Sequence, residues 1–385
     1  MKFIHLADLH LGKSLGAFDL IDDQRYIVKQ ILELAKEEAV DAVLIAGDVY
    51  DKTIPSEAAV NLLDDFLHSL SALRIKTFMI SGNHDSDDRL NFGSRLFESN
   101  DLYIASRYKG SLYKKTLTDA HGEVNIYLLP FVKASYVRHY HPEAEIASYE
   151  DAVKTVLAQA DIDPDKRNIL VAHQFVAGKS VDPELGGSEG PATQNVGLVE
   201  KIGYACFDAF DYVALGHIHA PQKIGRTEVR YAGSPLKYSL RESESKKSIP
   251  LVSFDEKGNI SIDFKELKPL RDLRHLKGSL KEILDPAHVT SPEDFIYVTL
   301  TDDTLISNVM GILQQTYPNT LKVDYDNMHS KELAYVDISK IAGQKSYDEL
   351  IGEFYEKMYG TPISEEEMAI MLSVGREAGV VHETD

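Results

Sequence analysis

Short apolar segments that end in Asp, His or Asn recur along the first half of this chain, and they constrain its fold more than any other feature. These segments occupy residues 3–7, 42–46, 77–80, 126–131, 169–172 and 212–215. Each is rich in Val, Ile or Phe, has the length of a strand and leads into polar residues, with segments of helical period between several of them. This alternation predicts a layered α/β fold.

Two helices are predicted between the early strands. The first carries apolar residues at helical spacing, at Ile27, Ile31, Leu34 and Ala35. The second is capped by Ser56 and carries a similar face at Val60, Leu63, Leu67 and Leu70. Such faces are expected to pack on a sheet. Further strands are predicted at residues 229–232, 251–254 and 260–264.

A domain boundary is predicted near Pro269, where the composition changes. The basic stretch 270–277 precedes a short unit with strands at 295–300 and 321–325 and a helix at 306–315. We therefore expect a main domain at residues 1–270, a small α/β cap at 271–340 and a C-terminal pair of amphipathic helices at 345–385. The break between those two helices is Gly-Thr-Pro at 360–362.

Composition excludes several classes of protein. No apolar run approaches the roughly 20 residues of a membrane-spanning helix, and the first residues lack the apolar stretch of a signal peptide, so a cytoplasmic protein with no membrane partner is expected. The single cysteine, Cys206, excludes an internal disulfide and a thiolate metal cluster. The net charge of -20 disfavours a nucleic-acid partner without excluding it, because ten acids against three bases lie after residue 342 and divalent cations reverse the sign around carboxylates.

Oxygen and nitrogen ligands gather where the predicted strands end, which is where open α/β sheets place their ligand sites. Asp8 and His10 are two residues apart at one such end, so they share a face and can chelate one ion. Asp48 follows a glycine that lets the backbone turn. One pair of this kind is more often structural, whereas five successive strand ends argue for a site. The predicted ligands are Asp8, His10, Asp48, Asn83, His173, His217 and His219.

This mixed ligand set suits Mn, Fe or Zn better than Ca or Mg. Seven ligands are too many for one tetrahedral ion, but two ions about 3.5–4 Å apart and bridged by a carboxylate would use them all. Asp48 is the natural bridge. Since paired cations of this kind hydrolyse phosphoesters, we predict that His84, beside Asn83 and not needed as a ligand, is the general acid for the leaving oxygen. Asp85 is a candidate to orient its ring.

The ordered motifs resemble the calcineurin-like metallophosphoesterases, through DLH, GDVYD, GNHD, the lone His173 and GHIH. A closer resemblance, to the SbcD family of nuclease subunits, rests on FIHLADLHLGKSL, GDVYDKTIPS, SGNHDS and GHIHAPQKIG followed by YAGSPLKYSL. It spans about residues 1–270 and extends more loosely to the end. The resemblance implies a core of two packed sheets flanked by helices. It also implies a DNA exonuclease and endonuclease with two Mn ions, or Mg, Fe or Zn in their place, working with an SbcC-type ATPase in DNA repair and recombination.

Two other functions stay open. A small-molecule phosphatase or phosphodiesterase would use the same metals, although it would need neither a cap nor an amphipathic tail. A non-catalytic scaffold of the same fold could lose ligands or His84 without penalty, whereas this chain has the full set.

Two apolar surfaces are candidates for partner binding. The first lies near the presumed site, at Leu90, Phe92, Leu96 and Phe97, where we predict a two-fold homodimer. The alternative is that these four side chains pack in the core of the chain itself. On the tail helices we predict docking on the coiled coil of the ATPase, as the resemblance implies, or else on the chain's own domain. The residues of that face are Leu350, Phe354, Met358, Met368, Met371 and Leu372.

Several polar residues receive other roles. We expect Asp51 to support the ligands instead of binding metal, and His5 to be packed or hydrogen-bonded within its strand. His139 and His141 are expected in a polar loop. Two roles are possible for Lys13, Arg89 and Arg95: each either contacts phosphate or lies on a surface exposed to solvent.

Overall fold

The computed structural model describes residues 1–178, 182–189, 201–326, 347–359 and 361–377. The chain forms two compact units, Met1–Asp272 and Leu273–Asp385, and each is described by itself. Among the described residues, no helix combines the length and apolar character that crossing a membrane requires.

The first sheet of the larger unit has the strand order β16-β15-β1-β4-β5-β6. Four of its strands are parallel: β1 (Lys2–Leu6), β4 (Ala42–Ala46), β5 (Lys76–Ile80) and β6 (Leu102–Ala105). Two later strands extend the sheet beyond β1: β15 (Ser248–Phe254) pairs antiparallel with β1, and β16 (Ile260–Glu266) pairs antiparallel with β15.

The second sheet has the order β13-β14-β12-β9-β8-β7. Its central strands are parallel: β8 (Gly122–Leu129), β9 (Arg167–His173), β12 (Tyr212–Gly216) and β14 (Arg226–Tyr231). The antiparallel edges are β7 (Tyr113–Asp119) and β13 (Gln222–Ile224). All the strands predicted up to residue 264 are therefore present.

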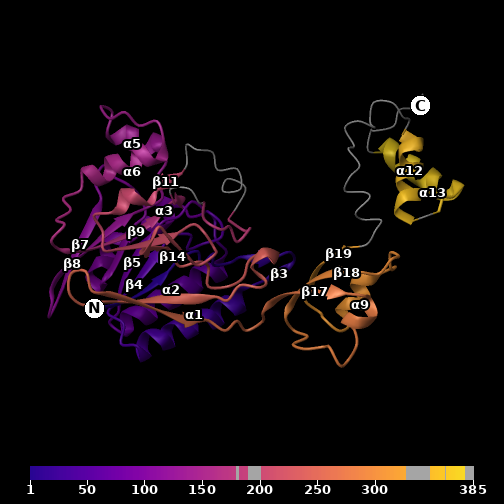
Figure 1. The fold of residues 1–385 in the computed structure, drawn as a ribbon, viewed down its shortest axis with the longest axis horizontal. Helices are drawn as coiled ribbons and strands as arrows, with labels where there is room; N and C mark the ends of the chain where they lie inside the picture. Colours follow the sequence, from indigo (N-terminus) through magenta and orange to yellow (C-terminus); the bar gives the residue numbers. More distant parts are fainter. Residues whose placement is uncertain (179–181, 190–200, 327–346, 360, 378–385) are drawn as a thin grey trace. The chain divides into compact units, whose positions relative to one another are not determined.

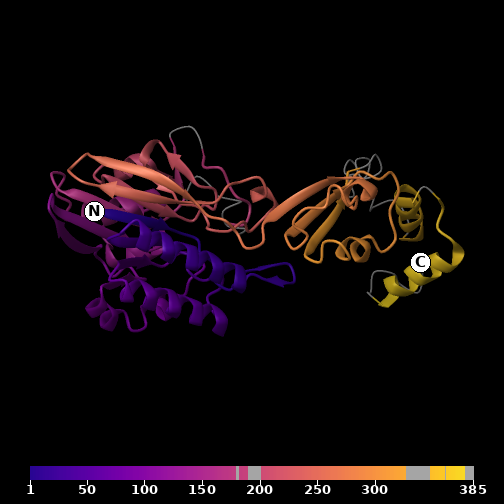
Figure 2. The same cartoon turned by 90° about the horizontal axis from the view of Figure 1, so that it is seen from below.

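The two sheets pack face to face, which confirms the predicted layered core. One buried cluster joins Phe3 and Phe78 of the first sheet to Ile126, Val171 and Tyr212 of the second. Because side chains alternate along a strand, the neighbouring residues of the second sheet face the other way and pack under helices α5 (Ala134–Tyr140) and α6 (Tyr149–Ala158). Figures 1 and 2 show the helices of this unit on the outer sides of its two layers of strands.

Helices α1 (Ile21–Glu37) and α2 (Glu57–Ala72) pack against each other, and α2 also contacts β5. Ser56 caps α2 as predicted, with its side chain accepting from the Ala59 amide at 3.3 Å. The predicted face of α2 is partly wrong, because Val60 is exposed. The residues that α2 buries are Ala59, Leu62, Leu63, Phe66 and Leu70.

Short elements complete the larger unit. The strands are β2 (Ser14–Leu15), β3 (Phe18–Asp19), β10 (Val176–Ala177) and β11 (Ile202–Gly203). The helical turns are α3 (Asp87–Asn91), α4 (Ser94–Phe97), η1 (Glu98–Asn100), η2 (Tyr204–Phe207) and η3 (Leu240–Glu242).

The smaller unit contains a parallel sheet of β17 (Leu273–Gly278), β18 (Phe295–Leu300) and β19 (Thr320–Tyr325). Its helices include α8 (Leu280–Ile283) and α9 (Val309–Gln314), the latter shorter than predicted. Its core centres on Ile296, Val298, Leu300, Leu313 and Tyr317. The basic stretch 270–277 contains the division between the two units, after Asp272, and continues as strand β17. The tail forms α12 (Tyr347–Tyr359) and α13 (Glu365–Glu377), which contact each other.

Candidate metal centre

Five parallel strands of the two sheets bring the predicted ligands to one place. Asp8 and His10 follow β1, Asp48 follows β4 and Asn83 follows β5, while β9 ends at His173 and β12 leads into His217 and His219. Two groups of predicted ligands form, each with its ligand atoms within 4.8 Å of one another: Asp8, His10 and His219, and Asp48, His173 and His217. A third group of this kind joins His10 to Asp51 and His84, neither of which is a predicted ligand.

Asp48 lies between the two groups. Its Oδ2 is 3.3 Å from Nε2 of His173 in its own group and 3.7 Å from Nε2 of His10 in the other. The Oδ1 atom of Asn83 completes the second group, at 3.0 Å from Nε2 of His173 and 2.8 Å from Nδ1 of His217. The position of Asp48 between the two groups is the one expected of a carboxylate that bridges two cations.

The buried donors fit a cation better than they fit each other. Asp8 is fully buried, and its Oδ2 has no hydrogen-bond partner among the described residues. Nε2 of His10 and Nε2 of His219 face each other at 3.0 Å. Since buried polar atoms are normally paired, the unpartnered Oδ2 of Asp8 indicates a bound group, and nitrogen with carboxylate oxygen is a donor set for divalent transition metals.

The backbone of the ligand residues is unusual. Asp8, His10, Asp48 and His217 have φ values of 52°, 44°, 49° and 103°, in the left-handed region that side chains other than glycine rarely adopt. Such conformations persist only where the surrounding structure enforces them, and they cluster at functional sites. The strand ends therefore hold these side chains in position at a cost to local stability.

Two glycines allow the close approach of these loops. A Cβ on Gly82 would lie 2.1 Å from Oδ1 of Asp48, and one on Gly216 would lie 2.0 Å from the carbonyl oxygen of Ala46. Any side chain at either position would push apart the strand ends that carry the ligands.

Burial and neighbouring charges shift the pKa values of the clustered side chains in opposite directions. Burial works against the charge of His173, but Asp48 raises the pKa of that imidazole to about 9. Burial likewise works against ionisation of Asp48, while His173 and His10 bring the pKa of that carboxyl well below its usual range. Burial raises the pKa of Asp8 to about 8 and lowers the pKa of His217 to about 3. The cluster thus favours one positive charge beside Asp48.

His84 lies at the rim of the cluster and is half-buried. Its backbone amide donates to Oδ1 of Asp48 at 2.9 Å, and its Nδ1 is 3.1 Å from the carbonyl oxygen of Asp51. The ring stands edge-on to His10, with centroids 4.8 Å apart. Because the carbonyl accepts from Nδ1, the protonated ring has its Nε2–H free to transfer.

Asp85 does not orient His84, and that prediction is wrong. Its carboxylate instead accepts from the backbone amides of Val49, Tyr50 and Gly82, at 3.1, 2.9 and 2.9 Å. These amides would otherwise be buried without partners where the loops after β4 and β5 meet, so Asp85 holds the two loops together.

Asp51 contacts His10 and Lys13. Its Oδ1 is 3.4 Å from Nδ1 of His10 and 2.7 Å from Nζ of Lys13, which also lies over the ring of Tyr238. Lys13 is thus held beside the cluster, whereas Arg89 and Arg95 are exposed to solvent.

Three other histidines considered in the sequence, His5, His139 and His141, have ordinary surroundings, and His139 lies in helix α5 where a loop was predicted. His5 is buried, with Nδ1 2.9 Å from the hydroxyl of Tyr212, as expected. His141 contacts the Tyr108 hydroxyl, and neither it nor His139 belongs to a potential metal group among the described residues.

Sequence reasoning missed a polar network behind His219. Ser188, Glu189, Glu242 and Lys247 are buried or nearly so and contact one another or His219. No motif identifies them, because the contacts join segments that are far apart in the chain and have no spacing in common with the strand ends.

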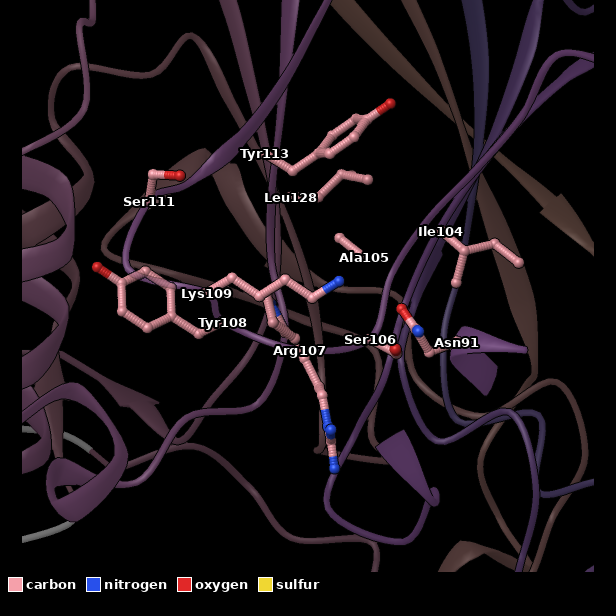
Figure 3. Close-up of a pocket in the computed structure, with 11 residues that line it drawn as sticks. Asn91, Ile104, Ala105, Ser106, Arg107, Tyr108, Lys109, Ser111, Tyr113 and Leu128 are labelled. Atoms are coloured by element: carbon pink, nitrogen blue, oxygen red, sulfur yellow. The ribbon is translucent and has the colours of Figure 1, made fainter. Parts of the chain in front are cut away.

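A pocket of about 140 Å³ lies between the ends of β6 and β8 and contains none of the predicted ligands. Figure 3 shows Arg107 and Lys109 at this pocket, together with Tyr108, Tyr113 and Leu128. Arg107 is paired with Asp88 at 2.9 Å, so part of the positive charge is already neutralised.

Comparison with known proteins agrees with this geometry. The family model described as calcineurin-like phosphoesterase matches residues 1–221, and one described as type 5 capsule protein repressor C-terminal domain matches residues 269–359. The chain is 35% identical over 373 residues to the SbcD subunit of nuclease SbcCD from Staphylococcus epidermidis, covering 95% of each chain.

A solved structure of a dimetal phosphatase from Danio rerio aligns with 70% of this chain and 98% of its own, at 11% identity and a TM-score of 0.40. The family model and the curated relative show which family the chain belongs to. It belongs to the calcineurin-like phosphoesterases and, among them, to the SbcD family of nuclease SbcCD subunits, and is a metal-dependent phosphodiesterase.

Proposed function

We propose that this chain is a two-metal DNA exonuclease and endonuclease that acts with an SbcC-type ATPase in DNA repair and recombination. The observation that carries the proposal is the convergence of six donors from the ends of five strands around a seventh, Asp48, with His84 at the rim. The curated relative is itself named as a nuclease subunit.

Each group of donors would hold one divalent cation, and Asp48 would be shared. The first site would use Asp8, His10, Asp48 and His219, and the second Asp48, Asn83, His173 and His217. When bound, such cations neutralise charge on phosphoryl oxygens and lower the pKa of water. We propose Mn as the metal, since mixed imidazole and carboxylate donors suit it better than Mg.

His84 supplies a proton that the metals do not. A phosphodiester that binds at the rim would bring its leaving oxygen near Nε2 of His84, while the carbonyl oxygen of Asp51 holds the opposite side of the ring. Lys13 lies at the same rim with its ammonium paired to Asp51, and we propose that its remaining ammonium protons contact a neighbouring phosphate.

A small phosphodiester is the competing substrate, and one assay separates the two. Purified protein is incubated with linear duplex, hairpin DNA and a small chromogenic phosphodiester, with Mn²⁺ or Mg²⁺ and with or without the ATPase. Mn²⁺-dependent cleavage of both DNAs, raised by the ATPase and ATP, supports the proposal. Rapid turnover of the small ester alone would favour a small-molecule phosphodiesterase.

The tail helices are proposed to bind the ATPase. Four of their apolar side chains are exposed, with Phe354 at 57%, Ile370 at 62%, Met371 at 41% and Val374 at 56%. The other described residues of the predicted face are partly buried: Leu350, Met368 and Leu372. The side chain of Met358 lies outside the described residues. A face of this kind on two short helices fits a partner that supplies an apolar groove.

Truncation after Ser346 tests this assignment. We expect it to leave Mn²⁺-dependent cleavage of small substrates unchanged and to abolish association with the ATPase. Phe354→Glu should do the same, whereas Glu366→Ala, a change to an exposed charged residue of α13, should not. Undiminished co-purification of the truncated chain with the ATPase would rule out the tail as the docking site.

A homodimer is proposed around α3 and α4. Leu90 is buried in the chain's own core, but Phe92 and Leu96 are 83% and 76% exposed. Sedimentation at micromolar concentration should show a dimer, and Phe92→Ser should convert it to monomer. Ile54→Ser, which changes another exposed apolar residue of the same unit, serves as the control. A monomeric unaltered chain would contradict this proposal.

A further inference from the structure

We infer that Ser188 is a positioning residue that fixes the ring of His219 so that its Nε2 is presented to the metal centre, an inference that rests on the proposed function. Ser188 belongs to the segment 182–189, which is separate in sequence from the strand ends that carry the proposed ligands. Its hydroxyl oxygen is 2.6 Å from Nδ1 of His219 and 2.8 Å from Oε1 of Glu242.

The direction of these hydrogen bonds follows from counting protons. A carboxylate only accepts, so the single hydroxyl proton of Ser188 is donated to Glu242. The Ser188 oxygen must then accept from Nδ1–H of His219. Nδ1 therefore carries the ring proton and Nε2 keeps its lone pair.

Lys247 keeps Glu242 in its acceptor state. The Lys247 ammonium lies within hydrogen-bond distance of Oε2 of Glu242, Oγ of Ser234 at 2.9 Å and the carbonyl oxygen of His219 at 3.0 Å. Three acceptors use all three ammonium protons. The side chains of Glu242 and Lys247 are 1% and 4% exposed, so water offers no alternative partner.

The lone pair of His219 points to the place where a cation would bind. Its Nε2 faces Nε2 of His10, and both belong to the group that includes Asp8. Glu189, next to Ser188, accepts from the His219 backbone amide at 3.3 Å, so one segment holds both the main chain and the ring.

His173 of the second group has its remote nitrogen held differently, by the carbonyl oxygen of Ala46 at 2.7 Å. A backbone carbonyl is present whatever the side chain. The support of His219, by contrast, comes from a side chain that substitution can remove. Such supporting hydrogen bonds typically account for about 10- to 100-fold in metal affinity.

Mn²⁺ titration calorimetry on the full-length chain tests the inference. Ser188→Ala should weaken one of two binding events by about 10- to 100-fold and leave the other unchanged. Ser188→Thr keeps the hydroxyl and should restore tight binding. Ser245→Ala is the matched control. The Ser245 hydroxyl donates to the backbone carbonyl of nearby Glu242 at 2.7 Å, but it makes no contact with the His219 ring among the described hydrogen bonds.

Two results would overturn the inference while leaving the proposed function intact. One is Ser188→Ala with both Mn²⁺ affinities unchanged, and the other is Ser188→Thr binding as weakly as the alanine variant.

A second experiment needs neither a variant nor a metal. Nitrogen-15 NMR of the histidine-labelled, metal-free chain should show His219 protonated at Nδ1. Protonation at Nε2 overturns the inference directly. Absence of Mn²⁺ binding by the unaltered chain overturns the proposed function and this inference together.

Discussion

The two ends of strand β9 hold charged clusters of opposite character. At its start, the guanidinium of Arg167 meets both oxygens of Asp119, at 2.5 and 3.1 Å, and the carbonyl oxygens of Gly122 and Asp255, at 2.7 and 2.5 Å. At its end, His173 belongs to a cluster in which Oδ2 of Asp8 lacks a partner within the described part of the chain. The first cluster is complete within the chain and contributes stability. The second needs a bound group to be complete.

The largest expected effect comes from breaking the incomplete cluster at its centre. Asp48→Ala should lower both Mn²⁺ binding and DNA cleavage to background, because it removes the donor shared by the two groups. Mn²⁺ at 100 times its Kd should stabilise the unaltered chain by about 2.7 kcal/mol per site, and this gain should vanish in the variant. Calorimetry and thermal unfolding measure both. Retention of two bound metals by Asp48→Ala would remove it from the bridging role.

His84→Ala should have the next largest effect and separates chemistry from metal binding. We expect kcat for duplex DNA to fall by about 10²- to 10⁴-fold with both metals still bound, since a general acid is lost and no ligand is. His68→Ala, on α2 and away from the strand ends, should behave like the unaltered chain. Cleavage at the parental rate by metal-loaded His84→Ala would show that the proton has another source.

The smallest effect is expected at the complete cluster. Asp119→Asn should leave cleavage unchanged and lower the free energy of unfolding at pH 7 by about 1–2 kcal/mol, through weaker hydrogen bonds to Arg167. Asp65→Asn, at an exposed position of α2, should change neither. Urea unfolding provides the measurement. A loss of cleavage in Asp119→Asn would mean that the two clusters are not independent.

The stability difference should also depend on pH in one direction. Hydrogen bonds from Arg167 lower the pKa of Asp119 below its ordinary 3.8. The folded state therefore binds fewer protons than the unfolded state, and the contribution is fully present above pH 3.8. As pH falls from there toward the folded pKa, the difference between the unaltered chain and Asp119→Asn should shrink. A difference that grows on acidification would contradict the assigned ion pair.

The sequence predicted the parts of this molecule that depend on local pattern. Strands such as β4 and β12 are continuous apolar runs buried on both faces, and the proposed ligands lie just after the points where those runs end. The face of α2 was less predictable, because apolar residues surround much of the helix and only packing decides between Val60 and Leu62. The return of β15 to pair with β1 depends on contacts between the two ends of the larger unit, which no local spacing encodes.

The supporting residues of the site were the least predictable. Asp85 sits beside His84 in the chain, yet its carboxylate turns to three backbone amides whose need for partners is set by the meeting of two loops. Ser188 approaches His219 across 31 residues of sequence. A short polar residue in a glycine-rich segment has many possible roles, and only the fold selects one.

The left-handed backbone at Asp8, His10, Asp48 and His217 places heat tolerance and cation binding in competition. Each such residue stores about 1–3 kcal/mol that glycine would release, or asparagine in part. Selection of a mutant library for thermal tolerance under chelation should therefore enrich glycine and asparagine at these positions. The same library, selected with Mn²⁺ present, should keep the original residues, because the bound ions then offset the strain.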